Sequence, residues 1–306
     1  MNGLADLFPG FEARSVDCDG VTISARVGGH GPALLCLHGY PQSHACWHKI
    51  AGRLAENHTV VLADLRGYGD SDTPAPDRGH EAYSKRAMGR DMVALMAALG
   101  HDRFVVMGHD RGARVAYRLA LDTPDAITAL IVLDIIPTIE VWDAMRAAAA
   151  IRSYHWSFLA QPAPLPETLI AAAPDAYLGA TLKSWVRDGD MRVFHPTALA
   201  HYHRQFANSE GIAAVCEDYR AGATYDAAVD AQDRAVGRMI DAPTLFVWGS
   251  DYLGRGGGDP LEVWRRWCKT ITGAAIASGH FLAEENPDAL LGEVLPFLDT
   301  VQCRNS

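Results

Sequence analysis

The stretch that decides the fold is Phe104-Val-Val-Met-Gly-His-Asp-Arg-Gly-Ala-Arg114. Four apolar residues typical of a buried strand lead into a Gly-x-Asp-x-Gly pattern centred on Asp110, and apolar residues at helical spacing follow. Glycines on both sides of Asp110 permit a strained turn that exposes the central side chain, as in a nucleophile elbow. The stretch therefore predicts strand, turn and helix, with Asp110 as a nucleophile. A helix-capping aspartate is the alternative interpretation.

Short apolar runs of the same kind recur along the chain and predict a mostly parallel, buried sheet with helices on both faces. They lie at Ala33–Leu37, Thr59–Ala63, Phe104–Met107, Leu130–Leu133 and Thr244–Trp248. Between about Ile139 and Tyr225 no strand-like run occurs, and we interpret this part as an inserted helical cap. The predicted organisation is an α/β core of residues 1–138 and 226–306 and a helical cap of residues 139–225.

The charge balance excludes several partner classes. The 306 residues include 27 Lys+Arg and 37 Asp+Glu, a formal net charge of −10, without a basic run that would bind nucleic acid. No apolar stretch is long enough for a signal peptide or a membrane span. The six cysteines are scattered, which favours buried free thiols. We expect a soluble, cytoplasmic protein that binds neither nucleic acid nor membranes.

Two further motifs surround the elbow in sequence order. His38-Gly-Tyr-Pro41 follows a strand where a backbone N–H, that of Tyr40, would form an oxyanion hole together with the N–H of Arg111. Ser278-Gly-His280-Phe lies near the C-terminus. A nucleophile at Asp110, an acid later in the chain and His280 would then follow the order nucleophile, acid, histidine that is typical of folds with a nucleophile elbow. Together these segments resemble the α/β-hydrolase superfamily. No Gly-x-Ser-x-Gly occurs, which argues against a serine esterase or lipase.

An aspartate nucleophile restricts the reaction. Its carboxylate can displace a leaving group from an sp³ carbon, and the resulting ester is hydrolysed by a water that a base, here His280, activates. Arg111 and Arg114 lie three residues apart on the first helical turn and predict a clamp for a substrate carboxylate. The alternative is that these arginines only balance nearby acids. Alkyl halides and epoxides are the chief substrates of such chemistry.

At this point the sequence resembles the haloacetate dehalogenases, most closely those acting on fluoroacetate. The resemblance is carried by Gly108–Arg114, Leu133–Pro137, Tyr154–Pro162, Cys216–Gly222 and Ser278–Phe281. It implies Asp110 as nucleophile, His280 as base and Asp134 as the acid that orients it. It also implies substrate-carboxylate binding by Arg111 and Arg114, halide binding by His155, Trp156 and Tyr219, and a pocket tryptophan at Trp185. Imidazole, indole and phenol donors suit a developing halide ion.

Several alternatives stay open. Asp251 follows a later strand and is the other candidate for the acid. An epoxide hydrolase of the same fold, or a ligand receptor without catalysis, is the alternative function. We expect no cofactor and no metal, and interpret His201 and His203 as packing residues, His109 as structural and Gly254–Gly258 as a surface loop. The expected ligands are water and a small halogenated carboxylate, and a homodimer is possible by resemblance.

Overall fold

A computed structural model describes residues 3–256 and 258–305. Its strands are β1 (Phe11–Cys18), β2 (Val21–Gly29), β3 (Ala33–Leu37), β4 (Thr59–Ala63), β5 (Phe104–His109), β6 (Ile127–Leu133), β7 (Thr244–Gly249) and β8 (Ile271–Ile276). In the described part of the chain they form one sheet of order β1-β2-β4-β3-β5-β6-β7-β8. Strands β3 to β8 pair in parallel, whereas β2 pairs antiparallel with β1 and β4. The predicted α/β fold with a mostly parallel sheet is confirmed.

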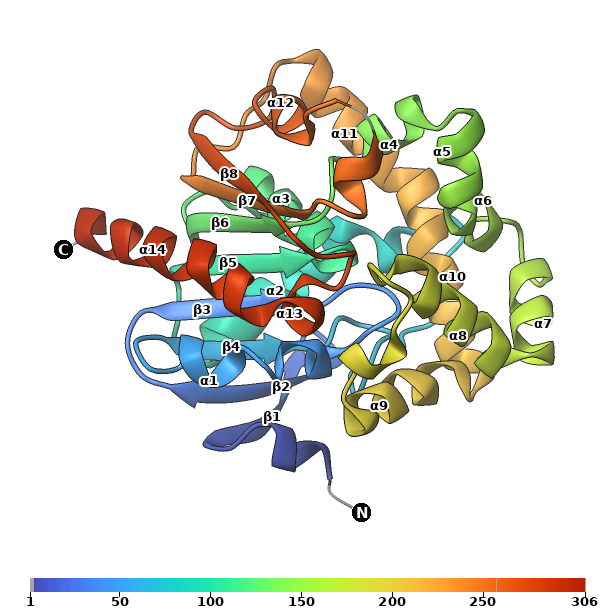
Figure 1. The fold of residues 1–306 in the computed structure, drawn as a ribbon, viewed down its shortest axis with the longest axis horizontal. Helices are drawn as coiled ribbons and strands as arrows, with labels where there is room; N and C mark the ends of the chain where they lie inside the picture. Colours follow the sequence, from blue (N-terminus) through green and yellow to red (C-terminus); the bar gives the residue numbers. More distant parts are fainter. Residues whose placement is uncertain (1–2, 257, 306) are drawn as a thin grey trace.

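Helices cover both faces of the sheet. They are α1 (Ala51–Leu54), α2 (Lys85–Ala98), α3 (Arg111–Asp122), α4 (Thr138–Ala144), α5 (Ala147–Arg152), α6 (Tyr154–Leu159), α7 (Leu165–Ala172), α8 (Pro174–Trp185), α9 (Pro196–Phe206), α10 (Ser209–Ala223), α11 (Tyr225–Ala235), α12 (Pro260–Trp264), α13 (Leu282–Glu285) and α14 (Pro287–Asn305). Short 3₁₀ helices are η1 (Leu4–Leu7), η2 (His44–Trp47), η3 (Glu81–Tyr83), η4 (Met191–Val193) and η5 (Leu253–Gly256). Figure 1 shows α14 in front of the sheet and α2 and α3 behind it.

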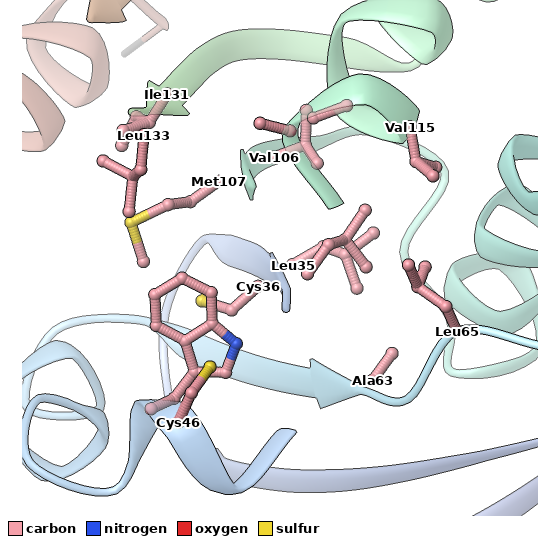
Figure 2. Close-up of a cluster of buried hydrophobic side chains, with 14 of the residues drawn as sticks. Leu35, Cys36, Cys46, Ala63, Leu65, Val106, Met107, Val115, Ile131 and Leu133 are labelled. Carbon is pink, nitrogen blue, oxygen red and sulfur yellow. The ribbon is translucent and has the colours of Figure 1, made fainter. Parts of the chain in front are cut away.

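The central strands are buried on both faces, which explains their continuous apolar sequences. Every residue of β3 and β5 is buried. Successive side chains of a strand point to opposite faces, and Figure 2 shows Met107 beside Cys36 on the side of Cys46, while Val106 lies toward Val115 of α3. The core therefore packs one helical layer against each face of the sheet.

All helices from α4 to α11 lie between β6 and β7 in the chain, and Figure 1 shows α5 to α10 gathered beside one edge of the sheet. Helix α11 is tied to the core by buried acids, because Asp230 accepts a hydrogen bond from Tyr117 (2.7 Å) and Asp233 pairs with Arg118 (2.5 Å). The proposed cap of residues 139–225 thus begins inside α4 and ends where α11 begins.

The structure also places the cysteines and the glycine-rich segment noted in the sequence. Cys18, Cys36, Cys46, Cys216 and Cys268 are buried, whereas Cys303 is exposed. Within the described ranges, none of the helices has the length and apolar character that a membrane span requires. The glycine-rich segment expected to be a surface loop forms η5 up to Gly256, and Gly257 lies outside the described residues.

Candidate active site

Asp110 occupies the tight turn between β5 and α3. Its backbone lies at φ 48°, ψ −115°, a conformation that costs a non-glycine residue about 1–3 kcal/mol. The flanking glycines are required sterically, since a Cβ on Gly108 would lie 2.5 Å from Ala113 Cα and one on Gly112 would lie 2.3 Å from the His38 carbonyl. The turn holds the Asp110 carboxylate at the carboxyl edge of the sheet and at the N-terminus of α3, where backbone N–H groups favour an anion.

The structure brings Asp110, Asp134 and His280 together. His280 Nδ1 lies 2.6 Å from Asp134 Oδ2, and its Nε2 lies 3.7 Å from Asp110 Oδ2. The other oxygen of Asp134 accepts the Gly249 backbone N–H at 2.9 Å, which fixes the carboxylate. Asp251 instead pairs with Arg187 (3.1 Å) and Arg255 (3.2 Å) and makes no recorded contact with His280.

Charges on these three groups are strongly coupled. Burial acts to raise the pKa of Asp110, but the positive charge of the nearby His280 imidazolium holds that pKa well below its usual range. Burial acts to lower the pKa of His280, whereas the two carboxylates beside it raise the pKa to about 9. Burial raises the pKa of Asp134 to about 6 despite His280. At neutral pH the site therefore holds two carboxylates with an imidazolium between them.

One oxygen of the Asp110 carboxylate accepts a backbone hydrogen bond. The Tyr40 backbone N–H donates to Asp110 Oδ1 at 2.9 Å. Gly39 makes this approach possible, since a Cβ there would lie 2.4 Å from the Asp110 Cβ. Arg111 is the first residue of α3, and N–H groups in a first helical turn have no partner within their helix. Both backbone donors expected from the sequence thus border Asp110.

Arg111 and Arg114 are both buried beside Asp110, but their surroundings differ. Both guanidinium groups lie near the Trp156 ring, with Cζ 5.7 Å (Arg111) and 4.5 Å (Arg114) from its centroid. Arg111 forms an ion pair with Asp218, a residue that the sequence reasoning missed. Asp218 directly precedes Tyr219 in a motif that was recognised, yet its partner is 107 positions away in the chain. Only the tertiary structure reveals this pair.

The three residues expected to bind halide converge from two helices, α6 and α10. The rings of His155 and Tyr219 are 5.7 Å apart, and those of Trp156 and Tyr219 are 6.0 Å apart. In the described structure, buried Tyr219 Oη and His155 Nδ1 have no hydrogen-bond partner. Burial lowers the pKa of His155 to about 3, so its imidazole is neutral. Unpartnered buried polar atoms are costly, so Tyr219 Oη and His155 Nδ1 are available to bind a polar group.

Trp185 lies between His155 and His280. Its ring centroid lies 4.6 Å from that of His155 and 5.3 Å from that of His280. Its carbonyl accepts the His280 backbone N–H at 2.9 Å, which joins the end of α8 to the histidine loop. The ring of Tyr252, which the sequence analysis did not single out, lies with its centroid 4.4 Å from that of His280 and 6.1 Å from that of Trp185.

The histidines given structural interpretations have protein partners. His109 Nε2 lies 2.7 Å from the His280 carbonyl oxygen. His201 contacts Ser43 (2.6 Å) and Asp70 (3.2 Å), and His203 contacts Asp175. No group of three or more metal-ligating side chains occurs among residues 3–256 and 258–305.

Comparison with known proteins agrees with this geometry. A family model described as the alpha/beta hydrolase fold matches residues 32–287. The chain is 43% identical over 282 residues to a fluoroacetate dehalogenase from Burkholderia sp, covering 92% of each protein. It is 31% identical over 271 residues to a soluble epoxide hydrolase from Corynebacterium sp. (strain C12), covering 88% of this chain and 91% of the relative.

A solved structure from Nostoc sp PCC 7120, provisionally named an alpha/beta hydrolase, matches with a TM-score of 0.92 and 47% identity, covering 95% of this chain and 99% of that one. The protein is therefore a hydrolase of the α/β-hydrolase superfamily. Within that superfamily, the chain belongs to the haloacetate dehalogenase family, as the extent and identity of the match to the Burkholderia protein show.

Proposed function

We propose that the protein hydrolyses haloacetates, including fluoroacetate, to glycolate and halide. One observation carries this proposal: near the Asp110 carboxylate lie a pair of buried guanidinium groups and two buried polar side-chain atoms without a partner in the described structure, Tyr219 Oη and His155 Nδ1. The first group suits the carboxylate of a substrate, and the second suits the anion that leaves from the adjacent carbon. The relative named as a fluoroacetate dehalogenase supports the same substrate class.

In the proposed reaction the two oxygens of Asp110 have different roles. Oδ1 accepts the Tyr40 N–H, so Oδ2 is the atom free to attack the halogen-bearing carbon. As the carbon–halogen bond breaks, negative charge moves to the halide, which Tyr219, His155 and Trp156 would stabilise. The product of this step is an ester at Oδ2, and its carbonyl oxygen Oδ1 stays beside the oxyanion donors.

Ester formation prepares the base for the second step. Asp110 loses its negative charge when it is alkylated, so one of the two carboxylates that raise the pKa of His280 disappears. His280 then releases its proton and its Nε2 can take a proton from water, which attacks Asp110 Cγ. Asp134 orients the ring through Nδ1. The oxyanion forms at Oδ1, and its collapse breaks the Cγ–Oδ2 bond, so that Oδ2 leaves as the hydroxyl oxygen of glycolate and takes the proton from His280 Nε2. Every step uses side chains of the protein and water.

Epoxide hydrolysis is the second candidate, favoured by the Corynebacterium relative and by the free hydroxyl of Tyr219, which could protonate an epoxide oxygen. The deciding experiment incubates the protein separately with fluoroacetate, chloroacetate and a neutral epoxide, and measures halide and diol. We expect halide release from both haloacetates, abolished by Asp110→Asn. Diol formation without halide release would refute the proposal. If neither halide nor diol forms, the result would favour a ligand receptor.

A further inference from the structure

Arg111 is held by an acid that leaves one of its nitrogens free. Both Arg111 and Asp218 have fully buried side chains. Arg111 Nε donates to Asp218 Oδ2 (3.0 Å), and Nη2 donates to both Oδ1 (2.5 Å) and the Asp218 carbonyl (2.7 Å). Nη1 is buried and has no partner within the described chain. Two of the three guanidinium nitrogens are therefore fixed by protein, and the third is available to a ligand.

A second layer fixes Asp218 itself. Lys85 from α2 forms an ion pair with Asp218 and lies 3.9 Å from Asp226 Oδ2, and the Tyr68 hydroxyl donates to Asp218 Oδ2 at 2.7 Å. The network contains two cations, Arg111 and Lys85, and two carboxylates, Asp218 and Asp226, so its formal charges cancel. Arg111 consequently brings an aimed donor to the site but little uncompensated charge.

The residues around the Arg111 guanidinium also leave no room for larger side chains. Gly222 lies one helical turn after Asp218 on α10, and a Cβ there would lie 3.0 Å from Nη2 and 3.3 Å from Nη1. The Tyr219 ring covers the guanidinium, with Cζ 4.3 Å from its centroid. Asp218 holds the edge of the planar guanidinium and Tyr219 covers its face, so the group cannot rotate freely. The direction of Nη1 is therefore set before a ligand arrives.

Arg114 has only uncharged partners. Its Nη1 donates to the Ile136 carbonyl (3.0 Å) and the Thr138 hydroxyl (3.1 Å), and no carboxylate in the described residues lies within ion-pair distance. Its Nε is buried without a partner. Arg114 is thus the guanidinium whose charge is available to an incoming anion.

We propose that Asp218 is a positioning residue of the substrate-carboxylate site: it aims Arg111 Nη1 at the ligand, and Arg114 supplies the uncompensated charge. This inference rests on the proposed function and divides the two arginines into unequal roles. A purely structural ion pair between α3 and α10 would leave the orphaned Nη1 unexplained, because a buried guanidinium normally has its N–H groups satisfied.

The test measures binding of acetate, which has the substrate carboxylate and no leaving group, by isothermal titration calorimetry. The variants are Asp218→Asn and the matched control Asp226→Asn. Each removes one negative charge from the same network, so their difference isolates the hydrogen bonds to Arg111. We expect acetate to bind about 10- to 100-fold more weakly to Asp218→Asn than to Asp226→Asn. Equal affinities would overturn the inference.

Two further measurements separate positioning from a folding defect. In an Arg111→Gln background, the acetate affinities of Asp218→Asn and Asp226→Asn should differ by less than about 3-fold. If Asp218 acts through Arg111, its replacement has little further effect once Arg111 is absent. Tyr68→Phe keeps every charge and removes one donor to Asp218, so we expect acetate binding about 2- to 5-fold weaker. If Asp218→Asn does not fold, unchanged binding in Tyr68→Phe overturns the inference. Wild-type protein that binds acetate but releases no halide would refute the proposed function alone.

Discussion

Replacing Tyr219 by Phe should slow carbon–fluorine cleavage without destabilising the protein. The hydroxyl is buried and has no partner in the described structure, so its removal breaks no hydrogen bond in the free protein. Its proposed partner is a halide ion that exists only as the reaction proceeds. The loss should therefore appear in the transition state of alkylation and leave the folded state unaffected.

The size of the effect follows from the charge on the leaving atom. A hydrogen bond to a charged group contributes about 1.5–3 kcal/mol, which corresponds to about 10- to 150-fold in rate. Fluoride concentrates its charge and needs donors most, whereas bromide is large and diffuse, so we expect about 3-fold or less for bromoacetate. The ratio of the two losses, about 3 or more, is the diagnostic quantity.

The assay is single-turnover halide release by rapid quench, with thermal unfolding measured in parallel. Tyr177→Phe is the matched control, because the Tyr177 hydroxyl accepts a hydrogen bond from Tyr40 Oη at 2.9 Å and lies outside the proposed machinery. The control should lose about 1–3 kcal/mol of stability by leaving the buried Tyr40 hydroxyl unpaired, with an unchanged rate ratio. Equal rate losses for fluoroacetate and bromoacetate in Tyr219→Phe would refute the role of Tyr219 as a halide donor.

Three other predictions concern the catalytic groups. His280→Asn should release one halide and stop, with one carboxymethyl group on Asp110 in the intact-protein mass spectrum; an unmodified protein after exposure to chloroacetate would contradict the ester mechanism. Asp134→Asn should slow ester hydrolysis about 100- to 10,000-fold because the imidazole loses its orienting partner, whereas Asp251→Asn should change turnover by less than about 3-fold; the reverse pattern would identify Asp251 as the acid. The alkylation rate should be independent of pH from about 5 to 9, since the pKa of Asp110 lies well below its usual range and the carboxylate is present throughout; a fall in single-turnover halide release as the pH drops from 7 to 5 would contradict that assignment.

Local sequence patterns predicted most of the sheet because buried parallel strands are apolar throughout. The runs at Ala33–Leu37 and Thr59–Ala63 match β3 and β4. The antiparallel strand β1 was missed, since its exposed faces carry charged residues and its stability comes from pairing with β2. Tertiary pairing outweighs local preference there.

The site was predictable where function imposes a rigid local pattern. The nucleophile turn needs glycine at fixed spacing because no side chain fits at Gly108 or Gly112, so the pattern can be read in sequence. The clamp was predicted as two equivalent arginines from their spacing of three. Spacing gives a shared helical face but contains no information on Asp218, which approaches from another helix. The inequality of Arg111 and Arg114 is therefore invisible before folding.

Binding of an anionic substrate beside the Asp110 carboxylate, as proposed, is opposed by the net charge of −10. In the proposed reaction, however, alkylation does not change the total charge of the site: it moves one negative charge from Asp110 Oδ2 to the halide. Arg114 can balance the substrate carboxylate before and after this step, while the donors beside Asp110 and those around Tyr219 stabilise the two ends of the displacement. The negative charge moves from Asp110 to the halide, and such a charge is stabilised best by hydrogen-bond donors that are already in position. The site therefore needs fixed donors beside Asp110 and beside the halide more than it needs additional positive charge. This explains why one arginine can be neutralised by Asp218 and still serve the reaction: its contribution would be direction, and the charge would come from Arg114.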